Sequence, residues 1–210
     1  MKHLRLAAFV SGSGSNMQSI IDAIYADELD ASIVQVIASK ENIPAEQRAK
    51  LYDLPYATFA RKKYAGNTLA MCQDIAEFLQ PQNIDLILLC GYLSFLSAQF
   101  VRLYPGRIMN IHPSLLPAFG GPGAYGMRVH QSVLEYGAKV SGCTVMFVDE
   151  GADSGPIILQ RPVPVSEDDT PETLAARVMI EENLAYPAAV KLFGENRLVL
   201  QGRRVHILPS

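Results

Sequence analysis

Short apolar segments alternate with amphipathic ones along the first 110 residues. The segments 4–10 and 84–90 are almost continuously apolar, which is typical of strands that a parallel sheet buries on both faces. The segments 15–26 and 67–80 carry apolar residues three and four positions apart, which predicts amphipathic helices. By the same criteria we expect strands at 32–39, 55–60 and 107–111, and helices at 45–54 and 97–104.

The second half of the chain has a different pattern. A loop rich in glycine and proline at 113–128 precedes a predicted helix at 129–137, and strands are expected at 143–150 and 156–165. Thr170, followed by Pro171, reads as the N-cap of a helix that reaches about Tyr186, where Pro187 is expected to kink or restart it. The tail at 197–208 reads as a hairpin that turns near Gly202.

Repeated strand–helix alternation predicts an α/β protein with a twisted, mostly parallel sheet, right-handed crossovers and helices on both faces. The later strands are expected to be partly antiparallel. The chain has 210 residues and no repeat, low-complexity tract or linker, so we expect one domain over 1–210, with halves at about 1–105 and 106–210.

Composition narrows the class of protein. Hydrophobic residues make up 49% and charged residues 19%, and a net charge of −3 argues against a broad surface for nucleic acid or an acidic membrane. Three cysteines without a CxxC pair suit a reducing cytosol and predict neither disulfides nor a zinc site, and Cys90 is expected to be a core residue. The apolar stretch Leu6–Val10 is too short for a signal peptide core, so we expect a cytoplasmic protein.

A glycine loop, Ser11–Asn16, lies between the first predicted strand and helix. Its backbone amides and the helix N-terminus predict an anion site. A dinucleotide fingerprint would need glycine where Met17 stands, the second strand does not end in an acid, and no Walker motif is present. A single phosphomonoester fits better; a tight turn without a ligand remains the alternative.

Polar residues end the fifth predicted strand in the motif "NIHP". Asn110 and His112 are two positions apart, so they share a face of the strand. Together they suit a carbonyl oxygen that becomes an oxyanion, although each could be a structural residue. The acidic loop Asp149–Pro156 could place a carboxylate beside His112 and favour its protonated form, or could be a solvated turn.

The motifs "SGSGSN", "NIHPSLLPAF" and "DEGADSGPIILQ" occur in this order and at these spacings from about Leu4 to Ile207. The chain thereby resembles the folate-dependent phosphoribosylglycinamide formyltransferases. The resemblance implies their Rossmann-like fold, a phosphate-binding first half, and a second half that binds folate and carries the chemistry. It implies no metal, small-molecule substrates, no nucleic acid or membrane partner, and a monomer or homodimer.

The resemblance also assigns roles residue by residue. The implied catalytic residues are Asn110, His112 and Asp153. The implied contacts to the phosphoribosyl substrate are Gly14, Ser15, Asn16, Met179, Ile180, Glu181 and Glu182. The implied contacts to 10-formyltetrahydrofolate are Leu93, Ser94, Phe95, Leu96, Asn110, Asp149, Glu150, Gly151, Ala152 and Asp153.

The implied reaction is attack by the amine of glycinamide ribonucleotide on the formyl carbon of 10-formyltetrahydrofolate. Asn110 and His112 would bind the oxyanion, and His112 would also move a proton towards the folate nitrogen. Asp153 would keep His112 charged and hold a water for the proton relay. The alternatives are formyltetrahydrofolate hydrolysis, a non-catalytic folate or nucleotide binder, formylation of initiator tRNA and a metal hydrolase.

The chain departs from the family pattern in places. Met146 and Met179 stand where many members have polar residues, and the loop at 120–130 is longer than in the most studied type. Arg128 therefore has no assigned role, and His130 is expected to be a surface residue at a helix start. The cation for the folate tail is not placed; the nearby candidates are Arg61, Lys62 and Lys63.

Overall fold

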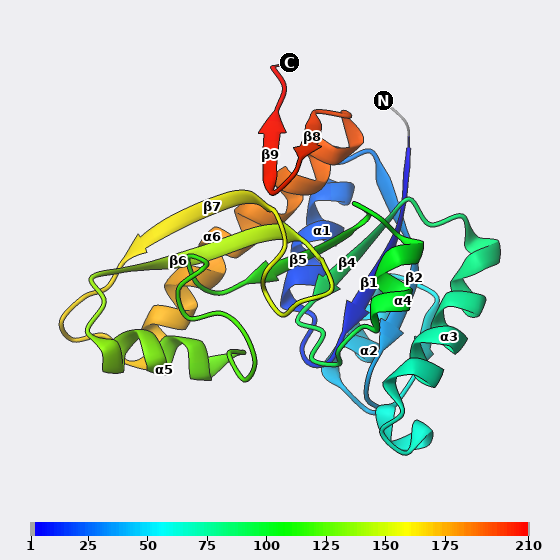
Figure 1. Cartoon of the computed structure of the whole chain (residues 1–210), viewed down its shortest axis with the longest axis horizontal. Coiled ribbons are helices and arrows are strands. Elements are labelled where there is room, and N and C mark those ends of the chain that lie inside the picture. Colours follow the sequence, from blue (N-terminus) through cyan, green and yellow to red (C-terminus); the bar gives the residue numbers. More distant parts are fainter. Residues whose placement is uncertain (1–2, 210) are drawn as a thin grey trace. The chain divides into compact units, whose positions relative to one another are not determined.

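The computed structural model describes residues 3–209, and its elements follow the predicted alternation (Figure 1). The strands are β1 (Leu4–Val10), β2 (Ala31–Ala38), β3 (Tyr56–Thr58), β4 (Leu86–Cys90), β5 (Ile108–His112), β6 (Val140–Phe147), β7 (Ile157–Pro164), β8 (Leu198–Gln201) and β9 (Arg204–Ile207). The α-helices are α1 (Ser15–Tyr25), α2 (Pro44–Leu51), α3 (Thr68–Leu79), α4 (Ala98–Leu103), α5 (Met127–Tyr136) and α6 (Pro171–Gly194). Two short 3-10 helices, η1 (Arg61–Tyr64) and η2 (Gln80–Gln82), flank α3.

The chain divides into two compact units, Met1–Met109 and Asn110–Ser210. The strand order is β3-β2-β1-β4-β5-β6-β7, and the chain passes from unit 1 to unit 2 inside β5. The expectation of one domain over 1–210 stays a prediction.

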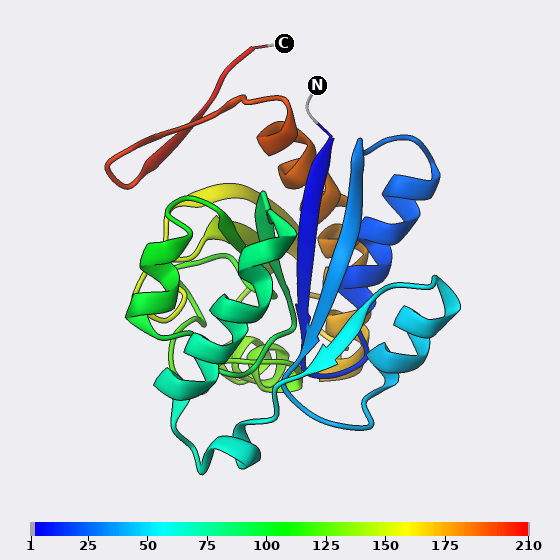
Figure 2. The ribbon, with the colours of Figure 1, turned by 90° about the vertical axis from the view of Figure 1, so that its right-hand side faces the viewer.

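Unit 1 is a parallel sheet with helices on both faces. β1 pairs in parallel with β2 and with β4, and β2 pairs in parallel with β3. Figure 2 shows α1 and α2 on one side of β1 and β2, and α3 and α4 on the other. Both faces of β1 are therefore covered, which explains why Leu6–Val10 is entirely buried and why the segment reads as continuously apolar.

Unit 2 contains the antiparallel part of the fold. β6 pairs antiparallel with β7, α6 packs against both strands, and α5 packs against α6. The tail forms the antiparallel hairpin of β8 and β9, with Gly202 in the left-handed region at its turn, as predicted. These pairings confirm the α/β fold with a mostly parallel sheet and antiparallel later strands.

Helix α6 corrects one prediction, because it continues through Pro187 to Gly194. A proline inside a helix leaves the carbonyl four residues earlier without its amide partner. That carbonyl belongs to Asn183, an exposed residue. Beyond the proline, Ala189 and Val190 are fully buried, and their burial favours continuing the helix over ending it.

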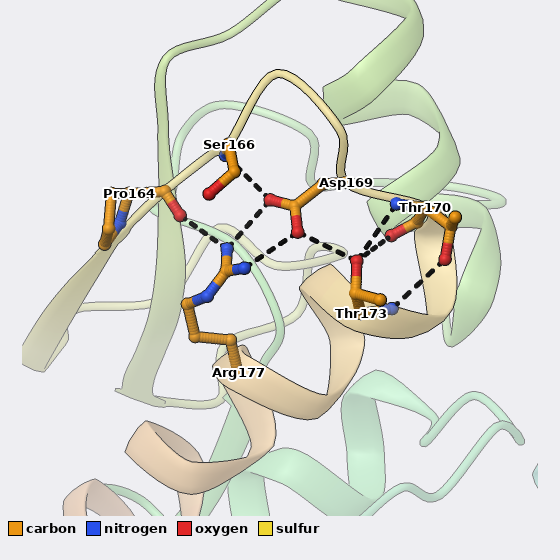
Figure 3. Close-up of polar contacts among 6 residues, drawn as sticks. All are labelled: Pro164, Ser166, Asp169, Thr170, Thr173 and Arg177. Atoms are coloured by element: carbon orange, nitrogen blue, oxygen red, sulfur yellow. Dashed lines mark hydrogen bonds and ion pairs between the residues drawn. The ribbon is translucent and has the colours of Figure 1, made fainter.

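The cap of α6 is built around Asp169, in what we call the Asp169 cluster (Figure 3). The Thr170 hydroxyl accepts from the Thr173 amide, as expected of an N-cap. The Asp169 carboxylate accepts two hydrogen bonds from the Arg177 guanidinium, at 2.8 and 2.7 Å, and one from the Ser166 amide at 2.8 Å. The bidentate Arg177 contact and further hydrogen bonds hold the pKa of Asp169 well below its usual range.

Replacing Asp169 with alanine is expected to lower the free energy of unfolding at pH 7 by about 2 kcal/mol, because several hydrogen bonds to a nearly buried carboxylate are lost together. A depressed folded pKa means that this stabilisation is present above the unfolded value of about 3.9 and is lost as pH falls below it. Urea unfolding of both proteins should therefore show a difference at pH 7 that shrinks towards pH 3.

The matched control for this prediction is Asp168→Ala, which removes an exposed acid from the neighbouring position. Its effect should stay within about 0.5 kcal/mol of zero, as is usual for surface substitutions. Equal losses for both variants, or a difference for Asp169→Ala that does not change with pH, would contradict the role given to the Asp169 cluster.

The cysteines are free and buried. Burial raises the pKa of the Cys90 thiol, and burial together with the charges of Glu182 and Glu181 raises the pKa of Cys143 to about 12. Cys90 is thus a core residue of β4, as predicted. Across residues 3–209, no helix is both long enough and apolar enough to cross a membrane.

Candidate active site

The carboxyl end of β5 carries Asn110 and His112, which lie on the same face of the strand because side chains alternate. His112 is 3% exposed, and Asn110 is half-buried. Buried polar side chains at the end of an apolar strand need partners, since an unpaired buried polar group is costly. The partners of His112 come from two later loops of unit 2.

Both ring nitrogens of His112 face oxygen atoms. Nε2 lies 2.9 Å from the backbone oxygen of Phe119, and Nδ1 lies 3.6 Å from Oδ2 of Asp153. A carbonyl oxygen can only accept, so Nε2 carries a hydrogen and donates it. The bond to Phe119 fixes the orientation of the ring, and the 3.6 Å separation leaves Nδ1 beside a carboxylate without a direct hydrogen bond.

Asp153 belongs to the acidic loop that follows β6. Its backbone is in the left-handed region, with φ of 52°, and Oδ2 also accepts from the Gly121 amide at 2.9 Å. Within the same loop, Asp149 accepts from the Gly151 amide and from the Ser154 hydroxyl. The loop is therefore held by its own hydrogen bonds, and it brings Asp153 to His112 as the sequence analysis expected; Glu150 and Ala152 lie in the same loop.

The glycine loop lies in unit 1 at the start of α1. Gly14 is the N-cap, with φ of 71°, and a Cβ there would lie 3.1 Å from Cβ of Ala45, so glycine suits both the backbone and the space. Ser15 begins the helix, and Asn16 is 8% exposed. The first backbone amides of α1 have no partner within the helix, and they point towards the glycine loop. This arrangement is the geometry of an anion site.

The segment Leu93–Leu96 follows β4 in unit 1 and presents apolar side chains to solvent. Leu93 is 49% exposed and Phe95 63%, whereas Ser94 is half-buried. The Leu93 amide donates to the Ser11 hydroxyl at 2.8 Å, which ties this segment to the glycine loop. Exposed apolar side chains held by such a bond suit the binding of an aromatic ligand.

The four residues 179–182 on α6 differ in exposure and in partners. Met179 and Ile180 are exposed, Glu181 forms an ion pair with Arg161, and Glu182 is 9% exposed. The helix turns by about 100° per residue, so these four side chains point in different directions. Glu182 and Met179, three positions apart, are the pair that shares a face.

His130 corrects an expectation, because it is buried and not a surface residue. It lies on the first turns of α5, and within residues 3–209 its buried Nδ1 has no hydrogen-bond partner. Burial, and then the charge of His112, lower the pKa of His130. The exposed Arg128 stacks on the Tyr125 ring, with its guanidinium carbon 5.0 Å from the ring centre.

Several site atoms were not found by sequence reasoning. The Phe119 carbonyl and the Gly121 amide are backbone groups, so the residue type at these positions does not indicate their role. Arg48, on α2, donates to the Ser13 carbonyl and adds a cation beside the glycine loop. Of the cations considered for the folate tail, Lys62 and Lys63 pair with Glu41 at 2.8 Å each and lower its pKa to about 2.

No group of three or more His, Cys, Asp or Glu that could hold a metal ion occurs among the residues that the structure describes. The end of β5 and the acidic loop offer hydrogen-bond donors and one His–Asp pair: the Asn110 amide, the His112 ring and the Asp153 carboxylate. Such a set can bind an oxygen that gains charge and can move a proton beside it.

A family model described as formyl transferase matches residues 4–190. The phosphoribosylglycinamide formyltransferase of Haemophilus influenzae is 38% identical over 203 residues, which make up 97% of this chain and 93% of that protein. The crystal structure of glycinamide ribonucleotide transformylase 1 from Symbiobacterium toebii has a TM-score of 0.92 at 40% identity, and the match covers 100% of this chain and 96% of that chain.

A formyltetrahydrofolate deformylase from Pseudomonas syringae has a TM-score of 0.89 at 22% identity, and the match covers 99% of this chain and 67% of that one. At this identity the likeness concerns the fold alone. The two transformylase relatives are closer in sequence and in length.

Proposed function

Because the chain belongs to the formyl transferase family, and within it to the phosphoribosylglycinamide formyltransferases, we propose that Asn110, His112 and Asp153 carry out its transfer of a formyl group to the amine of glycinamide ribonucleotide. The chain is a transferase of purine biosynthesis that acts on small molecules, and its family uses a folate-derived formyl donor. The donor proposed here is 10-formyltetrahydrofolate.

The observation that carries the proposed roles is the approach of His112 Nδ1 to Asp153 Oδ2 at 3.6 Å. Nε2 is already engaged with the Phe119 carbonyl, so Nδ1 is the nitrogen left for the reaction. The Asp153 carboxylate is the negatively charged group beside this nitrogen. Asn110 supplies a neutral donor from the same strand face.

The reaction balances without a further reactant. The amine nitrogen forms a bond to the formyl carbon, and the electron pair of the carbonyl bond moves to oxygen, where Asn110 and His112 donate. The intermediate then breaks its bond to folate N10, and the proton lost by the amine reaches N10 through His112 and a water held by Asp153. The products are formylglycinamide ribonucleotide and tetrahydrofolate.

Further segments are assigned to the binding of the two substrates. The glycine loop at Gly14–Asn16 would bind the phosphate of the ribonucleotide through helix amides. Leu93–Leu96 and the acidic loop Asp149–Asp153 would bind the folate, with Phe95 as an apolar contact for its ring system. Glu182 would bind the polar end of the ribonucleotide from α6.

The test is a deformylation assay with 10-formyltetrahydrofolate, run with and without glycinamide ribonucleotide. The proposal expects turnover that depends on the amine. Turnover at the same rate without the amine would instead identify a formyltetrahydrofolate hydrolase, and binding of the folate without turnover would identify a non-catalytic binder. Either of these results would overturn the proposed function.

A further inference from the structure

A three-residue turn, Phe119–Gly121, contacts both members of the His–Asp pair through its backbone. The Phe119 oxygen accepts from His112 Nε2 at 2.9 Å, and the Gly121 amide donates to Asp153 Oδ2 at 2.9 Å. The spacing between imidazole and carboxylate therefore depends on where this turn lies. A backbone group that orients a catalytic ring in this way is part of the catalytic geometry.

The turn is packed without free space at its centre. A Cβ on Gly120 would lie 2.3 Å from Cδ2 of Leu116 and 3.3 Å from Cβ of Asp153. Phe119 and Gly121 both have positive φ, at 55° and 95°. The turn thus rests on Leu116 on one side and on Asp153 on the other, so any shift of the Leu116 segment reaches the pair.

The Leu116 segment is in turn held by two side chains from the β6–β7 hairpin. Thr144 is fully buried; its hydroxyl donates to the Ser114 oxygen at 2.6 Å and accepts from the Leu116 amide at 3.0 Å. Gln160, which stands opposite Thr144 in the antiparallel register, donates to the Leu116 oxygen at 2.9 Å and to the Thr144 hydroxyl at 3.0 Å. One hydroxyl thus makes three hydrogen bonds.

We propose that Thr144, supported by Gln160, is a positioning residue that sets the geometry of His112 and Asp153 through Leu116 and the Phe119–Gly121 turn. The inference rests on the proposed function for its kinetic test, and it goes beyond that function because Thr144 touches neither catalytic side chain. A hydroxyl with three partners fixes the backbone of Ser114–Leu116 in a way that an apolar side chain of equal size does not.

The first variant is Thr144→Val, which keeps the shape of the side chain and removes the hydroxyl. We expect kcat to fall about 10- to 100-fold, as for other residues that orient a catalytic group, while KM for both substrates changes less than about twofold. Thr144→Ser restores the hydroxyl and should recover most of kcat. Gln160→Ala, at an exposed position, should lower kcat in the same direction by a smaller factor.

The same strand offers a matched control. Ser141 is 3% exposed on β6, and within residues 3–209 its buried hydroxyl has no hydrogen-bond partner. Ser141→Ala therefore removes a buried hydroxyl from the same element without loosening the turn, and its kcat should equal that of the wild type. Thermal unfolding of every variant gives its folded fraction, and kcat is calculated per folded molecule.

A second readout does not depend on activity. The chain has four histidines, and the ring nitrogen signals of His112 are identified by their loss in His112→Asn. We expect these ¹⁵N signals to be alike in the wild type, Thr144→Ser and Ser141→Ala, and shifted in Thr144→Val. If the wild type transfers no formyl group, the proposed function fails, and the ¹⁵N signals still decide whether Thr144 positions His112.

The inference would be overturned by wild-type kcat and His112 signals in Thr144→Val, by an equal loss of kcat in Thr144→Ser, or by an equal loss of kcat in Ser141→Ala. A fall in kcat that disappears after correction for the folded fraction would also overturn it. Should Thr144→Val not fold, Gln160→Ala replaces it in both measurements, because removal of an exposed side chain leaves the core intact.

Discussion

Asp153→Asn is expected to lower kcat by about 10²- to 10⁴-fold, the range for loss of an acid–base function. The substitution keeps the size of the side chain and an oxygen that can accept from the Gly121 amide. It removes the negatively charged carboxylate beside His112 Nδ1, so that carboxylate no longer takes part in proton transfer at this nitrogen. Steady-state kinetics with 10-formyltetrahydrofolate and glycinamide ribonucleotide measure the effect.

The control for this variant is Asp168→Asn, which neutralises an exposed acid of the same unit and should leave kcat unchanged. The thermal unfolding midpoint of Asp153→Asn should stay close to that of the wild type. If Asp153→Asn kept wild-type kcat, the His112–Asp153 pair would have no part in the proton transfer, whatever their distance.

Asn110→Ala is expected to lower kcat by about 10²- to 10³-fold, because the oxyanion loses one of its two donors. A donor that acts only when charge develops on oxygen affects kcat more than KM. The half-buried position at the end of β5 allows the shorter side chain without a large cavity, so the folded protein should persist. Kinetics under the same conditions, with circular dichroism as a check of folding, give the result.

The companion variant Asn110→Asp separates the effect of the lost hydrogen-bond donor from the effect of a changed side-chain shape. Aspartate has the size of asparagine but donates no hydrogen bond when ionised, so its loss should be at least as large as that of Asn110→Ala. Activity retained in Asn110→Asp would show that the amide of Asn110 does not bind the oxyanion, and the donor would have to be sought elsewhere.

Periodicity predicted most of the fold because unit 1 is a buried parallel sheet. Strand β1 is apolar at nearly every position because helices cover both of its faces. Such a segment can be predicted from the sequence alone. The predicted end of α6, at about Tyr186, was wrong because tertiary packing extends the helix. Local rules place a break at Pro187, whereas burial of Ala189 and Val190 beyond it outweighs one lost hydrogen bond.

The site was predictable only where side chains carry it. The spacing of Asn110 and His112 and the motif around Asp153 pointed to one strand end and one loop. The burial of His130 was missed, because a histidine near a helix start gives no sign of which face packs inward. The contacts of Phe119, Gly121 and Thr144 depend on how a turn folds back, which neither pattern nor composition encodes.

The most direct test of the central claim follows the formyl carbon itself. Wild-type protein is mixed with 10-formyltetrahydrofolate labelled with ¹³C in the formyl group and with glycinamide ribonucleotide, and the products are read by NMR. The account predicts the label in the formamide of formylglycinamide ribonucleotide, with transfer slowed about 10²- to 10⁴-fold in Asp153→Asn. Label released as free formate, at a rate independent of the amine, would contradict it.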